Sequence, residues 1–300
     1  MSSMQVLTVD KLLKQKEPFA AAIGFFDGVH LGHQKVIGRA VDYAKANDFK
    51  SLVITFDRSP KGLNDGVITT LDAKLQLLTE LDVDYVLVLE FNDLLKQLSA
   101  ADFVRNYLLQ LGVRYVSVGF DFRFGHQGVG DALYLQKWEE LTVDICEAEL
   151  IDGVKIGSTE IKKSLKDGDL AGVKAMLGRA FSVVGTVVHG KKLGRTIGFP
   201  TVNLQLDAGQ FLGVRGVFVT RVYLDGKEYS SMTNVGYNPT ANLQQILRVE
   251  THIFDFDADI YGAQLQLEFL AKIRDEIKFA SVDELVAQLE KDKKIAEKTH

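Results

Sequence analysis

Residues 21–40 read AAIGFFDGVHLGHQKVIGRA, and this stretch decides the fold of the first half of the chain. An apolar run is followed by a glycine-containing turn and then by residues with the spacing of an amphipathic helix. That order predicts a buried strand, a turn and a helix, which together begin a βα unit. The first N–H groups of a helix lack intrahelical partners, so the turn is a candidate phosphate site.

The turn also carries two histidines, His30 and His33, three residues apart at the start of the predicted helix. Side chains at this spacing point the same way. Imidazoles so placed can donate hydrogen bonds to the charge that develops on a phosphate under attack. Two histidines taken alone fit a surface or capping role equally well.

The same pattern continues outward from this stretch to about residue 150. Short apolar runs such as SLVITF, YVLVLEF and RYVSVGF alternate with segments of helical spacing, which is typical of a parallel sheet buried on both faces. Ser99 and Asp102 predict the N-terminus of a helix over 100–111, which Gly112 would end.

Beyond residue 182 the pattern changes to strand after strand. Asp225-Gly226 is a hairpin turn signal, and the run of strands predicts a small antiparallel barrel. Ser281 with Glu284 predicts a capping box at the start of a closing helix. We therefore expect two domains, 1–182 and 183–300, joined near 178–185.

Composition excludes several classes of protein. The 300 residues carry a net charge of −5, which argues against a molecule-wide basic field for nucleic acid or an anionic membrane. Cys146 is the single cysteine, so an intramolecular disulfide or a thiolate zinc cluster is excluded. No apolar window approaches the ~18 residues that a membrane helix needs. These features favour a cytoplasmic protein, with no nucleic-acid or membrane partner, no obligatory protein partner evident and homo-oligomerisation left open.

The string FDGVHLGH resembles the H-x-G-H signature of the nucleotidyltransferase superfamily, in the form that FAD synthetases carry. The resemblance implies a Rossmann-like α/β domain that adenylylates FMN, with His30 and His33 as catalytic residues. It implies that ATP phosphates are bound by the residues around them, which are Gly24, Phe25, Asp27, Gly28 and Gly32.

Two further segments are similar to the same family. VGFDFRFGHQGVGD (118–131) looks like its second glycine-rich segment, which implies a flavin-binding role for Asp121, Phe122, Phe124 and Gly125. GSTEIKKSLKDGDL (157–170) is similar to its S-S-T-x-x-R stretch, in which Ser158, Thr159 and Lys162 would bind phosphate. Each has a plainer alternative: two core phenylalanines in the first, and a helix cap in the second.

The sequence departs from that family at three positions. Lys162 replaces the arginine of its motif, which keeps the charge but loses bidentate geometry towards phosphate. FDRSP replaces the usual F-D-P-H-P, so that Arg58 and Ser59 stand where proline and histidine are expected. Arg58 would offset part of the loss by supplying a nearby cation.

In the second half, GRTIGFPTVN (194–203) closely resembles the riboflavin kinase motif G-x-P-T-x-N. Pro200 fixes φ and gives Thr201 and Asn203 a rigid strand start, and their oxygens suit a hard cation such as Mg²⁺. The glycines and cations of this loop would fold over ATP. The set expected to bind ATP comprises Gly190, Lys191, Gly194, Arg195, Gly198, Pro200, Thr201 and Asn203, with Thr201 and Asn203 also as metal ligands.

Downstream segments match the riboflavin kinase family in order. In LRVETHIF, strand alternation places Arg248, Glu250 and His252 on one face. The resemblance implies that Glu250 is the general base for the ribityl 5′-hydroxyl of riboflavin, while the role of His252 stays open. Arg274 and Phe279 look like residues near the flavin ring, although Phe279 also fits an anchor for the closing helix.

The whole chain thus resembles the bifunctional riboflavin kinase/FAD synthetase family of bacteria. This implies a transferase with Mg²⁺ and ATP that makes FMN from riboflavin and then FAD from FMN. One alternative is a kinase alone, with the first domain weakened at Arg58, Ser59 and Lys162. Another is a non-catalytic flavin-binding regulator.

Overall fold

The computed structural model describes residues 4–60, 62, 66–190, 193–239 and 245–299. The chain divides into two compact units, Met1–Ser158 and Thr159–His300. The second unit therefore takes in most of α7 and all of α8 (below), which precede the boundary expected at 182/183. Among the described residues, none of the helices is long and apolar enough to cross a membrane.

The first unit is built on a six-stranded sheet in which every pair of neighbouring strands is parallel, in the order β1-β4-β3-β2-β5-β8. Its strands are β1 (Gln5–Leu7), β2 (Phe19–Ile23), β3 (Lys50–Phe56), β4 (Tyr85–Leu89), β5 (Val113–Gly119) and β8 (Thr142–Cys146). Its helices are α1 (Val9–Leu12), α2 (Leu31–Asn47), α3 (Leu71–Glu80), α4 (Asp93–Gln97), α5 (Ala100–Val104) and α6 (Ala132–Leu135), with the 3₁₀ turns η1 (Asp27–Val29) and η3 (His126–Gly128) and the π-helical turn η2 (Arg105–Leu109). Two small hairpins complete it: β6 (Arg123–Phe124) with β7 (Gly130–Asp131), and β9 (Leu150–Ile151) with β10 (Val154–Lys155).

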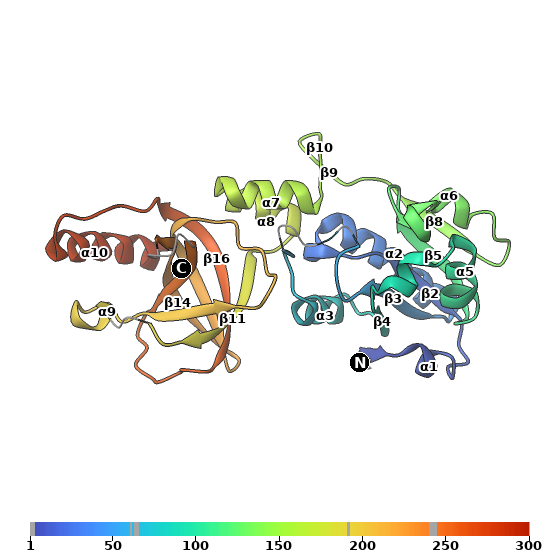
Figure 1. Ribbon diagram of the computed structural model, residues 1–300, viewed down its shortest axis with the longest axis horizontal. Coiled ribbons are helices and arrows are strands. Elements are labelled where there is room, and N and C mark those ends of the chain that lie inside the picture. The colour runs from blue at the N-terminus through green and yellow to red at the C-terminus, as the bar shows by residue number, and fades with distance from the viewer. Residues whose placement is uncertain (1–3, 61, 63–65, 191–192, 240–244, 300) are drawn as a thin grey trace. The chain divides into compact units, whose positions relative to one another are not determined.

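Both faces of this sheet are buried, as the near-continuous apolar strands predict. On β2, Phe19, Ala21 and Ile23 belong to one hydrophobic cluster and Ala20 and Ala22 to another. The second cluster lies under α2 and α3, and the first under α1, α5 and α6 (Figure 1). The predicted helix over 100–111 is confirmed at its start, where the Ser99 hydroxyl accepts from the Asp102 N–H, but it changes to a π-helical turn at η2.

The second unit is a closed antiparallel barrel with strand order β11-β12-β15-β14-β13-β16 (Figure 1). Its strands are β11 (Phe181–Val188), β12 (Val202–Leu206), β13 (Gly216–Leu224), β14 (Lys227–Pro239), β15 (Gln245–Ile253) and β16 (Gln264–Arg274). Its helices are α7 (Ser158–Asp167), α8 (Leu170–Leu177), α9 (Leu193–Thr196) and α10 (Val282–Thr299), of which α7 begins at the last residue of the first unit.

Local signals in the barrel sequence are confirmed. Asp225 and Gly226 have φ of 50° and 74° and join β13 to β14, as a two-residue hairpin turn requires. The Ser281 hydroxyl accepts from the Glu284 N–H at 3.2 Å, as expected for the start of α10. This helix packs on β13, β14 and β16 and so covers one side of the barrel.

Candidate active sites

The first site is a strained turn between β2 and α2. Phe26, Gly28 and Val29 have φ of 55°, 81° and 41°. Positive φ is free for glycine but unfavourable for a β-branched residue such as Val29. Such strain costs about 1–3 kcal/mol per residue, persists only where the surroundings hold it, and gathers at functional sites.

Contacts from distant segments hold this turn in place. The Asp27 carboxylate accepts hydrogen bonds from the backbone N–H groups of Ile68 (2.8 Å) and Thr69 (3.3 Å). The Ser158 hydroxyl, at the start of α7, donates to the Asp27 carbonyl at 3.1 Å. The Gln34 amide donates to the Val29 carbonyl at 2.9 Å. The turn therefore depends on α2, Ser158 and the 68–69 segment together.

His30 and His33 lie together where α2 begins. His30 is the N-cap residue, its Nδ1 accepts from the His33 N–H at 3.3 Å, and the two rings stack with centroids 3.5 Å apart. Burial, and next the nearby His30, Lys74 and Lys155, hold the pKa of His33 well below its ordinary value of 6.5. His33 is therefore neutral at neutral pH, and its buried Nδ1 has no hydrogen-bond partner among the described residues. A Cβ on Gly32 would press on the His30 ring at 3.3 Å.

The predicted flavin residues of this unit divide into accessible and buried ones. Asp121 is exposed, and its carboxylate pairs with Lys155 at 2.6 Å. Phe122 is half-buried and stacks on Phe124, which is itself buried in the core and so is less accessible to a ligand. Gly125 has φ of 73°, and a Cβ there would lie 2.8 Å from Ala100.

The residues that depart from the FAD synthetase pattern have partners of their own. The Arg58 guanidinium donates two hydrogen bonds to the neighbouring Asp57 carboxylate, at 3.0 and 2.8 Å. Thr159 is exposed at the start of α7, and one turn later the Lys162 ammonium lies 5.3 Å from the ring centre of Phe211.

The second site lies on three neighbouring strands of the barrel. Asn203 of β12 is paired in register with Glu250 of β15, which is paired in turn with Asn234 of β14. Residues directly opposite one another lie on the same face with Cβ atoms about 5 Å apart, so this row gathers two amides around one carboxylate. The Glu250 side chain is about a third exposed, and Arg248 approaches it at 3.5 Å.

The loop before β12 fits closely around Asn203. A Cβ on Gly190 would lie 2.1 Å from the Asn203 amide nitrogen, so only glycine leaves room for that side chain. Gly194 accepts from the Phe199 N–H at 2.9 Å and Gly198 has φ of 82°, which closes the turn before Pro200. Lys191 lies outside the described residues, and Arg195 belongs to α9.

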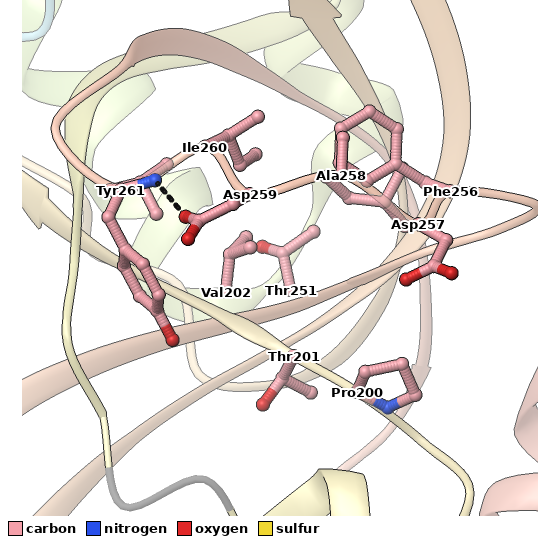
Figure 2. A pocket seen from close by; sticks show the side chains of 12 residues that line it. Pro200, Thr201, Val202, Thr251, Phe256, Asp257, Ala258, Asp259, Ile260 and Tyr261 are labelled. Carbon is pink, nitrogen blue, oxygen red and sulfur yellow. Dashed lines mark hydrogen bonds between the residues drawn. The ribbon is translucent and has the colours of Figure 1, made fainter.

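Thr201 opens onto a cavity of about 450 Å³, which Val202 and Thr251 also line. Figure 2 shows Thr201 and Pro200 on one side of it and the segment from Phe256 to Tyr261 on the other. The Tyr261 N–H donates to the Asp259 carboxylate at 3.2 Å. The 256–261 wall was not predicted from the sequence as part of a site, because its position beside Thr201 depends on strand pairing.

Thr201 and Asn203 offer a hydroxyl and an amide oxygen two residues apart, which is the oxygen-rich chemistry that Mg²⁺ prefers. No group of three or more His, Cys, Asp or Glu side chains that fits a metal ion occurs in the part of the chain that the structure describes. A hard cation here would therefore need phosphate oxygens and water to complete its shell.

The last two predicted flavin residues have structural neighbours. The Arg274 guanidinium donates three hydrogen bonds of 2.8–3.1 Å to the Asp292 carboxylate of α10. It also lies 5.8 Å from the ring centre of Phe279. Flavin contact by Arg274 and Phe279 stays a prediction.

Comparison with known proteins identifies the family. The FAD synthetase family matches residues 12–160 and the riboflavin kinase family residues 177–300. The bifunctional riboflavin kinase/FMN adenylyltransferase of Listeria monocytogenes is 37% identical, over 90% of this chain and 89% of its own. Its namesakes in Bacillus subtilis (99% and 97% covered) and Escherichia coli (92% and 91%) are 33% and 38% identical. A Streptococcus pneumoniae crystal structure titled a macrolide-efflux protein shares the fold, with a TM-score of 0.88, 30% identity and coverage of 97% and 98%.

These matches decide among the alternatives that the sequence left open. Both halves have a family match, and the curated relatives carry both activities in their names, so a kinase alone and a non-catalytic regulator are not favoured. The chain belongs to the bifunctional riboflavin kinase/FMN adenylyltransferase family of transferases.

Proposed function

We propose that the two activities of the family divide between residues 1–182, which adenylylate FMN, and residues 183–300, which phosphorylate riboflavin. The first reaction converts riboflavin and ATP to FMN and ADP. The second converts FMN and another ATP to FAD and pyrophosphate. The pairing of Asn203 with Glu250 carries the kinase assignment, because it joins two separate motifs in one row.

In the barrel, Glu250 acts as the general base. Its carboxylate accepts the proton of the ribityl 5′-hydroxyl while that oxygen attacks the γ-phosphorus of ATP and ADP leaves. The Glu250 carboxylate is about a third exposed, lies between the neutral amides Asn203 and Asn234, and has the Arg248 guanidinium 3.5 Å away. Bound Mg²⁺ would neutralise charge on the phosphates. Thr201 and Asn203 would hold it, and the cavity beside Thr201 would receive ATP with the loop of Gly190, Gly194, Gly198 and Arg195.

In the first unit, His30 and His33 stabilise the transition state of adenylyl transfer. An FMN phosphate oxygen attacks the α-phosphorus of ATP, and pyrophosphate leaves. FMN phosphate is already ionised at neutral pH, so the step needs no protein base. The neutral His33 imidazole carries one N–H, which can donate a hydrogen bond to a phosphate oxygen. The start of α2 supplies backbone N–H groups to the same anion.

The test incubates the protein with riboflavin, ATP and Mg²⁺ and separates the products FMN and FAD by chromatography. His30→Ala and His33→Ala are each expected to reduce FAD formation from supplied FMN by about 100- to 1000-fold. Both should leave FMN formation unchanged. Glu250→Gln should instead reduce FMN formation and leave FAD formation from supplied FMN unchanged. A histidine variant that lost FMN formation, or a Glu250 variant that kept it, would contradict this division of roles. Chelation by EDTA should stop both reactions if Mg²⁺ serves them.

Composition supports a proposal about the cellular setting. We propose that the protein works in the cytoplasm on small-molecule substrates, since its one cysteine needs no oxidising compartment and its net charge of −5 argues against a molecule-wide basic field for nucleic acid. Fractionation of the cells that make it would check the location.

A further inference from the structure

A lysine is buried beside the first site, and neither family motif includes it. Lys74 of α3 is 2% exposed. Its ammonium donates to the backbone carbonyl of Phe25 at 2.6 Å and lies 3.4 Å from the Thr55 hydroxyl. It also lies 4.2 Å from the centre of the Phe25 ring. The Thr55 hydroxyl donates to the same carbonyl at 3.1 Å, so one oxygen receives two donors.

Burying this ammonium is costly. Burial lowers the pKa of Lys74 from 10.5 to about 8, and the charge of Asp27 only partly opposes that effect. Among the described residues, the ammonium contacts a carbonyl, a hydroxyl and a ring rather than a carboxylate. A methionine or leucine would fill the same space without this cost. A costly group retained beside a site is typical of a functional role.

The carbonyl that Lys74 holds belongs to the residue immediately before the strained turn. Phe26 follows with φ of 55°, and Val29 with φ of 41° closes the turn before His30. Asp27 and Val29 are held by hydrogen bonds from other segments, as described above. Lys74 and Thr55 supply the matching restraint at the entry to the turn. Without it, the strain would be relieved by rotation of the Phe25–Phe26 peptide, which would shift the backbone that leads to His30.

We propose that Lys74 is a positioning residue for adenylyl transfer, whose buried ammonium fixes the Phe25 carbonyl and with it the strained turn that presents His30 and His33. The proposal rests on the assignment of those two histidines. Lys74 acts through the backbone, so we assign it no contact with ATP. Its charge also contributes to keeping His33 neutral.

The test compares Lys74→Met, which keeps the length of the side chain but removes the donor and charge, with Lys45→Met, at an exposed position of α2, as the control. Lys74→Met should lower kcat for FAD formation from supplied FMN about 100-fold, as expected for a small misplacement of catalytic groups. FMN formation by the same preparation should stay within twofold, and the control should keep both activities. FAD formation within twofold of wild type in Lys74→Met would overturn the proposal.

The pH dependence of kcat for FAD formation shows whether Lys74 acts through its charged ammonium or only by filling space. Two titratable groups act on or respond to Lys74: the Asp27 charge raises the pKa of Lys74, and His33, whose own pKa is held well below 6.5, is neutral in this pH range. In the wild type, kcat for FAD formation should therefore fall as pH rises through about 8, while FMN formation shows no such limb. Residual FAD formation by Lys74→Met should lack this limb. A wild-type kcat that stays flat from pH 7 to 9.5 would refute the role of the ammonium even if the variant did not fold.

The outcomes distinguish this proposal from the one on which it rests. If His30→Ala and His33→Ala keep FAD formation, the catalytic assignment fails. If they lose it while Lys74→Met does not, only the positioning role fails. Trp138, the one tryptophan of the chain, lies in the same unit as Lys74. Its fluorescence emission therefore reports whether Lys74→Met has folded.

Discussion

Replacing Asp292 by leucine would show whether Arg274 anchors α10 or serves the flavin. Asp292 is fully buried, and its carboxylate accepts three hydrogen bonds from Arg274 and one of 2.8 Å from the Gln288 amide. Breaking a buried ion pair by removing one partner costs about 3–5 kcal/mol. The Arg274 side chain is 15% exposed and can recover some hydration, so we expect the lower end, about 3 kcal/mol.

The expected loss is large enough to measure by thermal unfolding. At roughly 3–4 °C per kcal/mol for a unit of this size, Asp292→Leu should lower the Tm of the second unit by about 10 °C. Arg274→Met should cost at least as much, because it leaves a fully buried carboxylate unpaired. The double variant Arg274→Met/Asp292→Leu should return to within about 1–2 kcal/mol of wild type, since an apolar pair replaces an ionic one. Circular dichroism follows the barrel, and Trp138 emission should show the first unit unchanged.

The contrary result is equally clear. If Arg274→Met raised KM for riboflavin many-fold at unchanged Tm, Arg274 would act on the flavin and the anchor explanation would be wrong. If the double variant lost as much stability as the two single variants together, Arg274 and Asp292 would not be coupled and the estimate from burial would fail.

Three other predictions concern His252 and the buried titratable groups. His252→Phe removes the 2.7 Å hydrogen bond between the His252 Nδ1 and the carbonyl of Pro200, which lines the cavity proposed for ATP. KM for ATP in FMN formation should therefore rise up to about tenfold, with FAD formation unchanged. His252→Asn should restore part of the loss. Because the folded-state pKa of Lys74 is lowered to about 8, the unfolded chain binds one more proton between pH 8 and 10. The free energy of unfolding, measured by urea titration, should therefore rise with pH in the wild type relative to Lys74→Met, by about 1.4 kcal/mol per pH unit in this range. A difference between the two proteins that does not change with pH would contradict burial of the ammonium. The lowered pKa of His33 has the same sign, so stability should be lost as pH falls below about 6.5, and His33→Phe should reduce that slope in denaturation followed by Trp138 emission.

The sequence predicted what depends on local chemistry. The strand, turn and helix around Gly28, the N-cap at Ser99 and the hairpin at Asp225-Gly226 are all present, because each is set by a few adjacent residues. The short edge strand β1 was missed, since three residues of mostly exposed sequence carry no periodic signal.

The sites depend on contacts that the sequence does not show. Asn203 and Glu250 meet because β12 and β15 are neighbours in the closed barrel, although β13 and β14 lie between them in the chain. Lys74 reads as an ordinary helix lysine, and only its spacing of four from the buried Leu78 hinted that it shares the buried face. The partner of Arg274 lies on a helix whose docking no motif encodes.

The register across β12, β15 and β14 limits how the kinase half can change in evolution. Successive side chains point to opposite faces, so inserting one residue within any of these strands would turn part of the strand over. Asn203 or Glu250 would then face the barrel interior, where Thr251 and Val249 now lie fully or almost fully buried. A closed barrel has no free edge at which such a slip can be absorbed. Insertions and deletions among relatives should therefore be confined to the connecting loops, whatever their effect on substrate affinity.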